Sequence, residues 1–475
     1  MAITISADAS KQTHRLGVLI LVGAMLAAAS TQAAAQSVNV AELDSLIRAT
    51  VRERGLVGLS VGVAQDGKIV LARGYGLRSL TSRDAVTPET KFAVGSVTKQ
   101  FTCSALLVLA QDNKLALDDR VSKYLPQLTR AGDITLLELG QHVSGYRDYY
   151  PLDFVDREML EPRPADSIIA AYAMRPLDFD PGTRWSYSNT NFLILGRVIE
   201  TVSGQGFGDF LSQRFFTPLG MAHTQYDPAR RDSSMAAGYT SFALGAPMPA
   251  TPEGAGWAGS AGAIWSTPTD LLTWDMALIG GKVLAPDSYR TLTTPRRLAD
   301  GRSTGYGCGE GVSDRGDALV LRHGGAVSGF VAQNTVIPAT RSAVVLLANT
   351  DFAAIDALNS AIVQRLAPHA DVPVIRGPPA LVAARQFLTG LERGTVDRST
   401  LGDDFNAFLT PALVAGARAS LSRLGTIRDL TVANTVERGG MEVAVLRFKI
   451  GSVQGQGLMY RTPDGKIQEL LIGRQ

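Results

Sequence analysis

The sequence predicts an α+β fold, in which one antiparallel sheet is flanked by helices and carries a helical insertion, and a small α+β domain follows at the C-terminus. Three observations lead to this prediction. A helix and a hairpin pattern open the chain, strand patterns return between Gly305 and Asn349, and a stretch rich in proline and glycine precedes residues 381–475. The 475 residues also exceed one small core, so two domains are expected.

The first expected element is a helix that begins after Asn39. Asn39 and Glu42 have the spacing of a capping box, and apolar residues follow at helical intervals: Leu43, Leu46, Ile47 and Val51. Two apolar strands, Gly58–Ala64 and Lys68–Tyr75, then surround Asp66-Gly67. An Asp-Gly pair between two such strands predicts a β-hairpin.

A helical insertion is expected between this hairpin and the later strands. An apolar helix should begin near Ser96 and end at about Asn113. Residues 120–260 show mixed helix and loop patterns, with many prolines and glycines. Thr267 and Pro268 then have the residue types that begin a helix, a cap followed by a first-turn proline. Residues 351–366 are again helical in pattern.

The last part of the chain is expected to form a separate unit. Residues 368–380 contain Pro373 and Gly377-Pro378-Pro379 and are typical of a linker. Beyond the linker we expect two helices, at residues 381–391 and 404–424. A meander of three strands should follow, at residues 441–448, 455–460 and 466–472. No catalytic constellation is visible in this segment, which we interpret as an accessory module.

The composition excludes several classes of function. Hydrophobic residues make up 45% of the chain, charged residues 19%, and the net charge is +2, so neither nucleic acid nor an anionic membrane surface is an expected partner. We expect no cofactor and no metal, because no histidine or cysteine pair has metal-ligand spacing. The two cysteines, Cys103 and Cys308, are interpreted as buried thiols in preference to a disulfide. The sequence leaves the oligomeric state open.

The N-terminus has the pattern of a secretory signal. Lys11 and Arg15 precede the apolar run Leu16–Ala29, and small residues follow at Ala33–Ala35. The run is shorter than the ~20 apolar residues of a spanning helix. We therefore expect residues 1–35 to be removed, with no membrane span left and a periplasmic or secreted protein; an uncleaved anchor is the alternative.

Ser96 and Lys99 form the most informative motif. A serine hydroxyl needs a base to become a nucleophile, and positions three apart share one helix face, so the Lys99 amine can reach Ser96. The amine must then be neutral at least part of the time, which burial promotes. Two further motifs follow in order, Tyr187-Ser188-Asn189 and His323-Gly324-Gly325.

The three ordered motifs resemble those of the serine β-lactamase and penicillin-binding-protein family, over roughly residues 40–366. The resemblance is to its class C-like branch, which includes β-lactamases, D-Ala-D-Ala carboxypeptidases, D-aminopeptidases and esterases. It implies a β-lactamase/transpeptidase-like fold for residues 36–367, with a small accessory domain at residues 381–475. It also implies a small-molecule or short-peptide substrate.

The resemblance implies a role for each motif residue. Ser96 would be the nucleophile, with Lys99 and Tyr187 as a base pair whose first acceptor stays open. Substrate would be bound by Asn189, His323, Gly324, Gly325 and Ala326, and the backbone N–H groups of Ser96 and Ala326 would form the oxyanion hole. His323 stands where β-lactamases of this branch usually carry lysine, which favours a peptidase or esterase.

Two competing motifs are discounted. Gly58-Leu-Ser60-Val-Gly62 matches the nucleophile elbow of α/β-hydrolases, which needs a strand, a sharp turn and a helix, whereas here a hairpin follows. The glycines of residues 305–311 are not a nucleotide loop, because no βαβ unit surrounds them.

Three hypotheses for function therefore stand side by side. The first is a secreted serine hydrolase that cleaves an amide or ester, such as a D-amino-acid peptide, a β-lactam or a small ester, through a Ser96 acyl-enzyme. The second is a slow-turnover penicillin-binding or sensor protein that acylates and barely deacylates. The third is a non-catalytic interaction protein, which would not require the Ser–Lys–Tyr set.

Overall fold

The structure of the protein is a computed structural model, which describes residues 38–152, 155–227, 231–242, 245–315, 318–366 and 372–474. The predicted signal segment, residues 1–35, and the first residues of the predicted linker lie outside the described residues. Among the described residues, no helix has the length and apolar character needed to cross a membrane.

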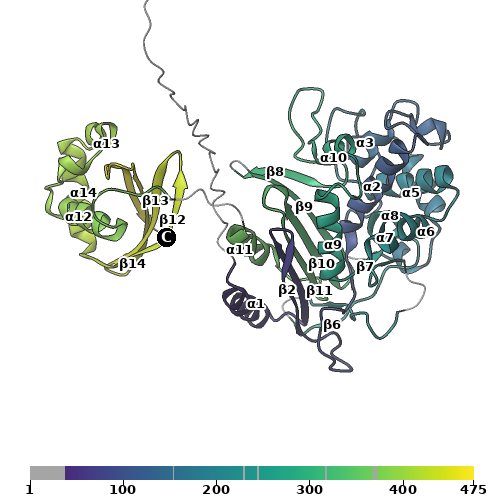
Figure 1. The fold of residues 1–475 in the computed structure, drawn as a ribbon, viewed down its shortest axis with the longest axis horizontal. Helices are drawn as coiled ribbons and strands as arrows, with labels where there is room; N and C mark the ends of the chain where they lie inside the picture. The colour runs from purple at the N-terminus through teal and green to yellow at the C-terminus, as the bar shows by residue number, and fades with distance from the viewer. Residues whose placement is uncertain are drawn as a thin grey trace, which may run out of the picture. The chain divides into compact units, whose positions relative to one another are not determined.

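An antiparallel sheet organises the larger part of the chain (Figure 1). Its six strands have the order β2-β1-β11-β10-β9-β8. Their bounds are β1 Gly58–Gln65, β2 Lys68–Gly76, β8 Gly311–Arg315, β9 Ala318–Val327, β10 Phe330–Ile337 and β11 Ser342–Ala348. The predicted hairpin at Asp66-Gly67 is confirmed, and the later strands lie within the predicted 305–349 segment. Pairing of β1 with β11 joins these two distant parts of the sequence.

Helices cover both faces of this sheet. In β11, Val344 and Leu346 pack in one apolar cluster with α1 (Val40–Arg54) and α11 (Asp356–Leu366), while Val345 and Leu347 pack in the cluster of the opposite face. On that opposite face α9 (Pro268–Ile279) contacts β1 and β11. Burial on both faces explains why the central strands are apolar at successive positions and do not alternate.

The predicted caps begin both helices, but the capping box predicted for Asn39 and Glu42 is only half formed, because the Glu42 carboxylate accepts hydrogen bonds from Arg365. The Asn39 side chain accepts hydrogen bonds from the backbone N–H groups of Ala41 and Glu42 at the start of α1. Thr267 accepts from the Asp270 N–H at the start of α9, with Pro268 in its first turn.

The helical insertion lies between β2 and β8. Its central helices are α2 (Thr98–Gln111) and α5 (Asn189–Ser203), which pack against each other and against α8 (Gly259–Gly262). The remaining helices are α3 Leu136–Gly140, α4 Ala165–Ala173, α6 Phe207–Leu211, α7 Thr217–Leu219 and α10 Pro286–Thr293, with a π-helical turn at Ser212–Phe216. Short strands complete it: β3 Phe92–Ala93, β4 Gln225–Tyr226, β5 Tyr239–Thr240, β6 Met248–Pro249 and β7 Ile264–Ser266.

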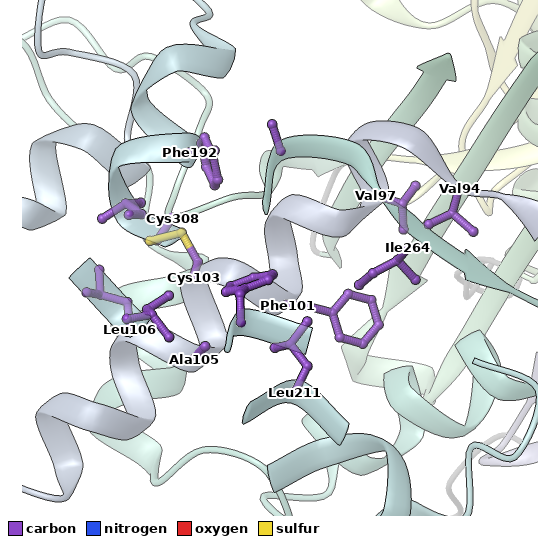
Figure 2. Close-up of a cluster of buried hydrophobic side chains, with 14 of the residues drawn as sticks. Val94, Val97, Phe101, Cys103, Ala105, Leu106, Phe192, Leu211, Ile264 and Cys308 are labelled. Carbon is purple, nitrogen blue, oxygen red and sulfur yellow. A yellow bond between two sulfur atoms is a disulfide. The ribbon is translucent and has the colours of Figure 1, made fainter. Parts of the chain in front are cut away.

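The α2 helix lies in the main apolar core and carries a disulfide. Figure 2 shows Phe101, Ala105 and Leu106 of this helix within the cluster, and the bond between Cys103 and Cys308. The expectation of two buried thiols is therefore wrong: both residues are buried, but their Cα atoms lie 5.7 Å apart. Sequence spacing does not show this proximity, because 205 residues separate the two cysteines.

The C-terminal residues form a sheet with its own apolar cluster. Its elements are α12 Ala380–Arg393, α13 Asp403–Phe408, α14 Pro411–Leu424, β12 Ile427–Arg438, β13 Met441–Ile450, β14 Val453–Arg461 and β15 Ile467–Arg474. The strands pair in sequence order. The end of the predicted linker packs onto this sheet, since Arg461 Nη1 donates to the Pro378 carbonyl at 2.7 Å.

Two C-terminal expectations are corrected. The single helix predicted over residues 404–424 is two helices, because Pro411 begins α14 and the Thr410 side chain caps it. The first strand, β12, was not predicted: its residues alternate weakly, and most of them are not buried. In the sheet β12 is an edge strand, paired with β13.

Candidate active site

The turn that carries Ser96 is held against strand β9. Ser96 lies in the short 3₁₀ turn Gly95–Val97, which leads directly into α2. Gly95 has φ +52°, and a Cβ atom at this position would lie 2.8 Å from the Ala326 backbone nitrogen. Only glycine combines this conformation with so close an approach of two backbones. Gly95 therefore allows the Ser96 turn to pack directly against β9, which carries the His323-Gly324-Gly325 motif.

Lys99 is fully buried beneath Ser96. Its ammonium nitrogen Nζ lies 3.0 Å from Ser96 Oγ, 2.7 Å from Asn189 Oδ1 and 2.8 Å from the Ala261 carbonyl oxygen. Lys99 itself lies on α2, and these three neighbours come from the 3₁₀ turn before α2, from α5 and from α8, so the packing of the insertion fixes the position of the amine. All three are neutral groups.

Burial changes the protonation of this lysine. It lowers the Lys99 pKa from 10.5 to about 7, and the charge of Asp148 partly opposes the shift. A lysine with that pKa is neutral in about half of the molecules at pH 7. The amine that touches Ser96 is therefore able to accept a proton near neutral pH.

Asp148 positions Asn189, and sequence reasoning missed it. Its Oδ1 accepts hydrogen bonds from the Asn189 backbone nitrogen at 2.9 Å and from Asn189 Nδ2 at 3.1 Å. The amide of Asn189 is thereby turned so that its oxygen faces Lys99. Asp148 lies outside the three motifs, so no sequence signal described above singles it out.

Tyr187 lies beside both Ser96 and Lys99. Its ring centroid is 4.9 Å from Lys99 Nζ. Burial raises the pKa of the phenol well above its ordinary value, and a hydrogen bond with the Ser96 side chain opposes this only in part. Tyr187 is therefore a protonated phenol at neutral pH, suited to donating a hydrogen bond or passing on a proton.

His142 is a second residue whose role the sequence did not reveal. Its carbonyl accepts from the Ser186 N–H, its Nδ1 accepts from the Ser188 N–H at 3.1 Å, and its ring lies 4.4 Å from the Tyr187 ring between centroids. Burial lowers the His142 pKa well below 6.5, so the imidazole is neutral and can accept this bond. His142 thus holds both neighbours of Tyr187.

His323 is buried and uncharged, and its ring centroid lies 6.3 Å from that of Tyr187. Its Nδ1 lies 2.6 Å from the Gly324 carbonyl, which can only accept, so Nδ1 carries the proton. Its Nε2 then accepts from the Tyr306 hydroxyl at 2.8 Å. Burial, together with the charge of Lys99, lowers the His323 pKa to about 3. Tyr306, the third missed residue, lies in the glycine-rich 305–311 stretch that was considered only as a nucleotide loop.

The remaining motif residues form the edge of the site along β9. A Cβ atom at Gly325 would lie 1.9 Å from the Val94 carbonyl oxygen and 3.2 Å from the Ser96 nitrogen, so any side chain there would push the nucleophile turn away. This closeness places the backbone of Gly325 and Ala326 next to that of Ser96. Gly324 pairs with Gln333 of β10. Ser60, of the discounted elbow motif, is buried within β1, and β2 follows it.

The structure therefore gathers all the residues singled out from the sequence around one point: Ser96, Lys99, Tyr187, Asn189, His323, Gly324, Gly325 and Ala326. An alcohol, a neutral amine and a phenol in contact can activate a nucleophile and return its proton to a leaving group. Adjacent backbone N–H groups can stabilise an oxyanion. Among the described residues, no cluster of acidic, histidine and cysteine side chains could hold a metal ion.

Comparisons with known proteins show which family the chain resembles. The model of the Beta-lactamase family matches residues 43–367. A D-aminopeptidase from Brucella anthropi is 31% identical over 299 residues, which is 62% of this chain and 56% of that protein. The chain thus spans little more than half the length of this curated relative.

Solved structures share the fold. A D-amino acid amidase from Ochrobactrum anthropi SV3, complexed with L-phenylalanine amide, has a TM-score of 0.60 and 23% identity, and the match covers 68% of this chain and 97% of that one. An octameric penicillin-binding protein homologue from Pyrococcus abyssi has a TM-score of 0.59 and 20% identity over 92% of this chain and 100% of its own.

Proposed function

The chain belongs to the Beta-lactamase family, and we propose that it is a serine hydrolase that cleaves small amides or esters of D-amino acids through an acyl-enzyme on Ser96. The observation that carries this proposal is the 3.0 Å contact between Ser96 Oγ and a buried Lys99 whose pKa is about 7. A nucleophile with a neutral base in contact is the minimum requirement for acyl transfer.

The two pKa directions support Lys99 as the first base. Neutral Lys99 takes the Ser96 proton while Oγ forms a bond to the substrate carbonyl carbon. Tyr187, a phenol at this pH, passes a proton to the leaving nitrogen or oxygen as the bond to carbon breaks, and recovers one from Lys99. Water then attacks the acyl-enzyme by the same proton transfers, which releases the acid and free Ser96.

Neutral His323 favours a substrate without a carboxylate next to the scissile bond. A protonated lysine in this position would offer a positive charge to a carboxylate, whereas His323 has a pKa of about 3 and offers none at neutral pH. An amino-acid amide or ester has no such carboxylate. The names of the relatives, a D-aminopeptidase and a D-amino acid amidase, support the same substrate class.

We also propose that the protein works outside the cytoplasm. The basic residues Lys11 and Arg15, the apolar run Leu16–Ala29 and the small residues Ala33–Ala35 support secretion with cleavage near Ala35. The test is the N-terminal sequence and the location of the mature protein in a secreting host. Full-length protein retained in the cytoplasm would contradict secretion without affecting the proposed chemistry.

The test of function compares wild type with Ser96→Ala on D-alanine p-nitroanilide, a cephalosporin and p-nitrophenyl acetate. We expect wild type to hydrolyse the D-alanine anilide and the ester, and Ser96→Ala to hydrolyse neither while keeping its circular dichroism spectrum. Mass spectrometry after brief exposure to the ester should show an acetyl group on Ser96. Rapid turnover of the cephalosporin alone would contradict the substrate class, and a long-lived adduct without turnover would favour the slow penicillin-binding alternative.

A further inference from the structure

A cavity of about 280 Å³ adjoins the nucleophile turn. Its lining includes Ala93, Gly262 and Ser328. A Cβ atom at Gly262 would lie 3.7 Å from the backbone of Gly95, the residue before Ser96. Ser328 follows β9 directly, two residues beyond Ala326. The cavity therefore adjoins the Ser96 turn at the end of β9 that lies beyond Ala326, away from His323 in the strand.

Glu253 is placed in this cavity by two hydrogen bonds. Its Oε1 accepts from the Ser328 backbone nitrogen at 2.9 Å and from the Tyr150 hydroxyl at 2.9 Å. Both of these bonds go to the same oxygen, Oε1, and the Glu253 side chain belongs to the cavity lining. The side chain is half-buried, so its charge is only partly screened by solvent.

The cavity is connected to the reaction centre through hydrogen bonds. Asp148, which orients Asn189, also accepts from the Tyr150 backbone nitrogen at 3.1 Å. The Tyr150 hydroxyl then donates to Glu253. The loop that contains Asp148 and Tyr150 therefore positions both the Asn189 amide, which contacts Lys99, and the Glu253 carboxylate in the cavity. The distance between these two groups is thus held by hydrogen bonds to one loop.

The charges of the cavity favour a cation. Its described lining contains two carboxylates, Glu253 and Asp227, and one guanidinium, Arg231. The Arg231 guanidinium lies 5.0 Å from the centroid of the Trp265 ring, and its charge also interacts with Glu253. The two carboxylates together still exceed the single guanidinium by one negative charge. At the other end of the site His323 is neutral and bonded to Tyr306. A substrate with a positive charge on its acyl part thus meets a complementary environment, and one with a negative charge does not.

We propose that Glu253 is a specificity residue that binds the protonated α-amino group of the substrate's acyl residue, so that the enzyme selects aminoacyl substrates with a free N-terminus. This inference rests on the proposed function, because it concerns the acyl side of the same Ser96 site. The ammonium would donate to Glu253 Oε2 while the carbonyl oxygen lies at the backbone of Ser96 and Ala326. An N-acylated substrate has no positive charge on its α-nitrogen, and its acyl group is larger than the ammonium that the cavity would otherwise hold.

The test is a ratio of two rates measured with wild type and with Glu253→Gln. The substrates are D-alanine p-nitroanilide and its N-acetyl derivative. Glutamine keeps an oxygen for the Ser328 and Tyr150 bonds and removes only the charge. We expect the kcat/KM ratio of free-amine to N-acetyl substrate to fall by about tenfold or more, mainly through KM, because a charge-assisted hydrogen bond is lost. A ratio within twofold of wild type would overturn the proposal.

Asp227→Asn is the matched control, since it removes the same charge from another wall of the same cavity. We expect its ratio to stay within twofold of wild type. A loss as large as that of Glu253→Gln would assign the ammonium to Asp227, or to the general field of the cavity, and would overturn the assignment to Glu253.

A binding measurement separates this inference from the proposed function. Isothermal titration of Ser96→Ala with D-phenylalanine amide and with its N-acetyl derivative needs no turnover. Tighter binding of the free amine that is lost in Ser96→Ala/Glu253→Gln supports the inference even if wild type fails to hydrolyse the amide. Equal binding of the two compounds overturns the inference even if hydrolysis is rapid.

Discussion

The two ends of the site each bury one basic side chain, and burial has opposite consequences for them. At the α2 end it lowers the Lys99 pKa from 10.5 to about 7. At the β9 end it lowers the His323 pKa from 6.5 to about 3. The two downward shifts are alike in size. The first brings the pKa of Lys99 into the physiological range, and the second takes the pKa of His323 out of it.

The comparison shows that burial alone does not make a catalytic base. The ordinary pKa of the buried group must lie above the working pH by about the amount that burial subtracts. Lysine meets this condition in this site and histidine does not. His323 is consequently a neutral partner of Tyr306, and Lys99 and Tyr187 are the residues that we propose for the proton transfers.

Removal of the lysine should have the largest effect. Lys99→Met keeps the length and apolar stem of the side chain but has no amine to accept the Ser96 proton. We expect kcat/KM for p-nitrophenyl acetate to fall by about 10³-fold, within the range of general base catalysis. A loss of less than tenfold, in a variant that is folded by circular dichroism, would show that another group is the first base.

The disulfide links the α2 end of the site to the end that contains His323, because Cys103 lies on α2 and Cys308 lies two residues from Tyr306, the partner of His323. The double variant Cys103→Ala/Cys308→Ala should lower the free energy of unfolding by about 2–4 kcal/mol, because the bond closes a long loop. Chemical denaturation measures this change. We expect activity to fall much less than stability, since Ser96 and Lys99 belong to one helical segment. Unchanged stability would mean that the bond does not couple the two ends.

The pH dependence distinguishes the two buried bases directly. Below pH 7 Lys99 binds a proton and loses its ability to accept one, so kcat/KM for an ester without ionisable groups should fall about tenfold per pH unit on the acid side. The apparent pKa of this limb should be close to that of Lys99, about 7. Initial rates between pH 5 and pH 9 measure it. A profile that stays flat down to pH 5 would contradict Lys99 as the titrating base.

His323→Gln should have the smallest effect. Glutamine can still accept a hydrogen bond from Tyr306, and a neutral residue replaces a neutral residue. We expect kcat/KM to change by less than tenfold and the acid limb to keep its position. If the acid limb disappeared in this variant, the titrating base would be His323 and not Lys99.

Local patterns predicted most of the fold. Capping residues such as Asn39 and Thr267 began helices where expected, and Asp66-Gly67 formed the hairpin, because these signals act within a few residues. The errors came where a pattern was short or weak. Thr410-Pro411 divided one predicted helix into two, and β12 was missed because few of its residues are buried.

Site residues could be predicted where their role depends on residue type. The prediction failed where a role depends on contact with a residue that is distant in the sequence. Ser96, Lys99, Tyr187 and His323 could be named because their motifs are ordered along the chain. Asp148, His142 and Tyr306 could not, since each acts only through a neighbour that is distant in sequence. Their contacts, with Asn189, Tyr187 and His323 respectively, arise from the packing of separate elements.

The sequence by itself determined the residue types of the candidate site, the hairpin and the helix starts, because these depend on side-chain chemistry and on interactions within a few positions. The tertiary structure alone decided the protonation of Lys99 and His323, the pairing of Cys103 with Cys308 and the place of Glu253 beside Ser328. The physical reason is that burial and contact between remote segments exist only once the chain has packed, and both the pKa values and the pairings depend on them.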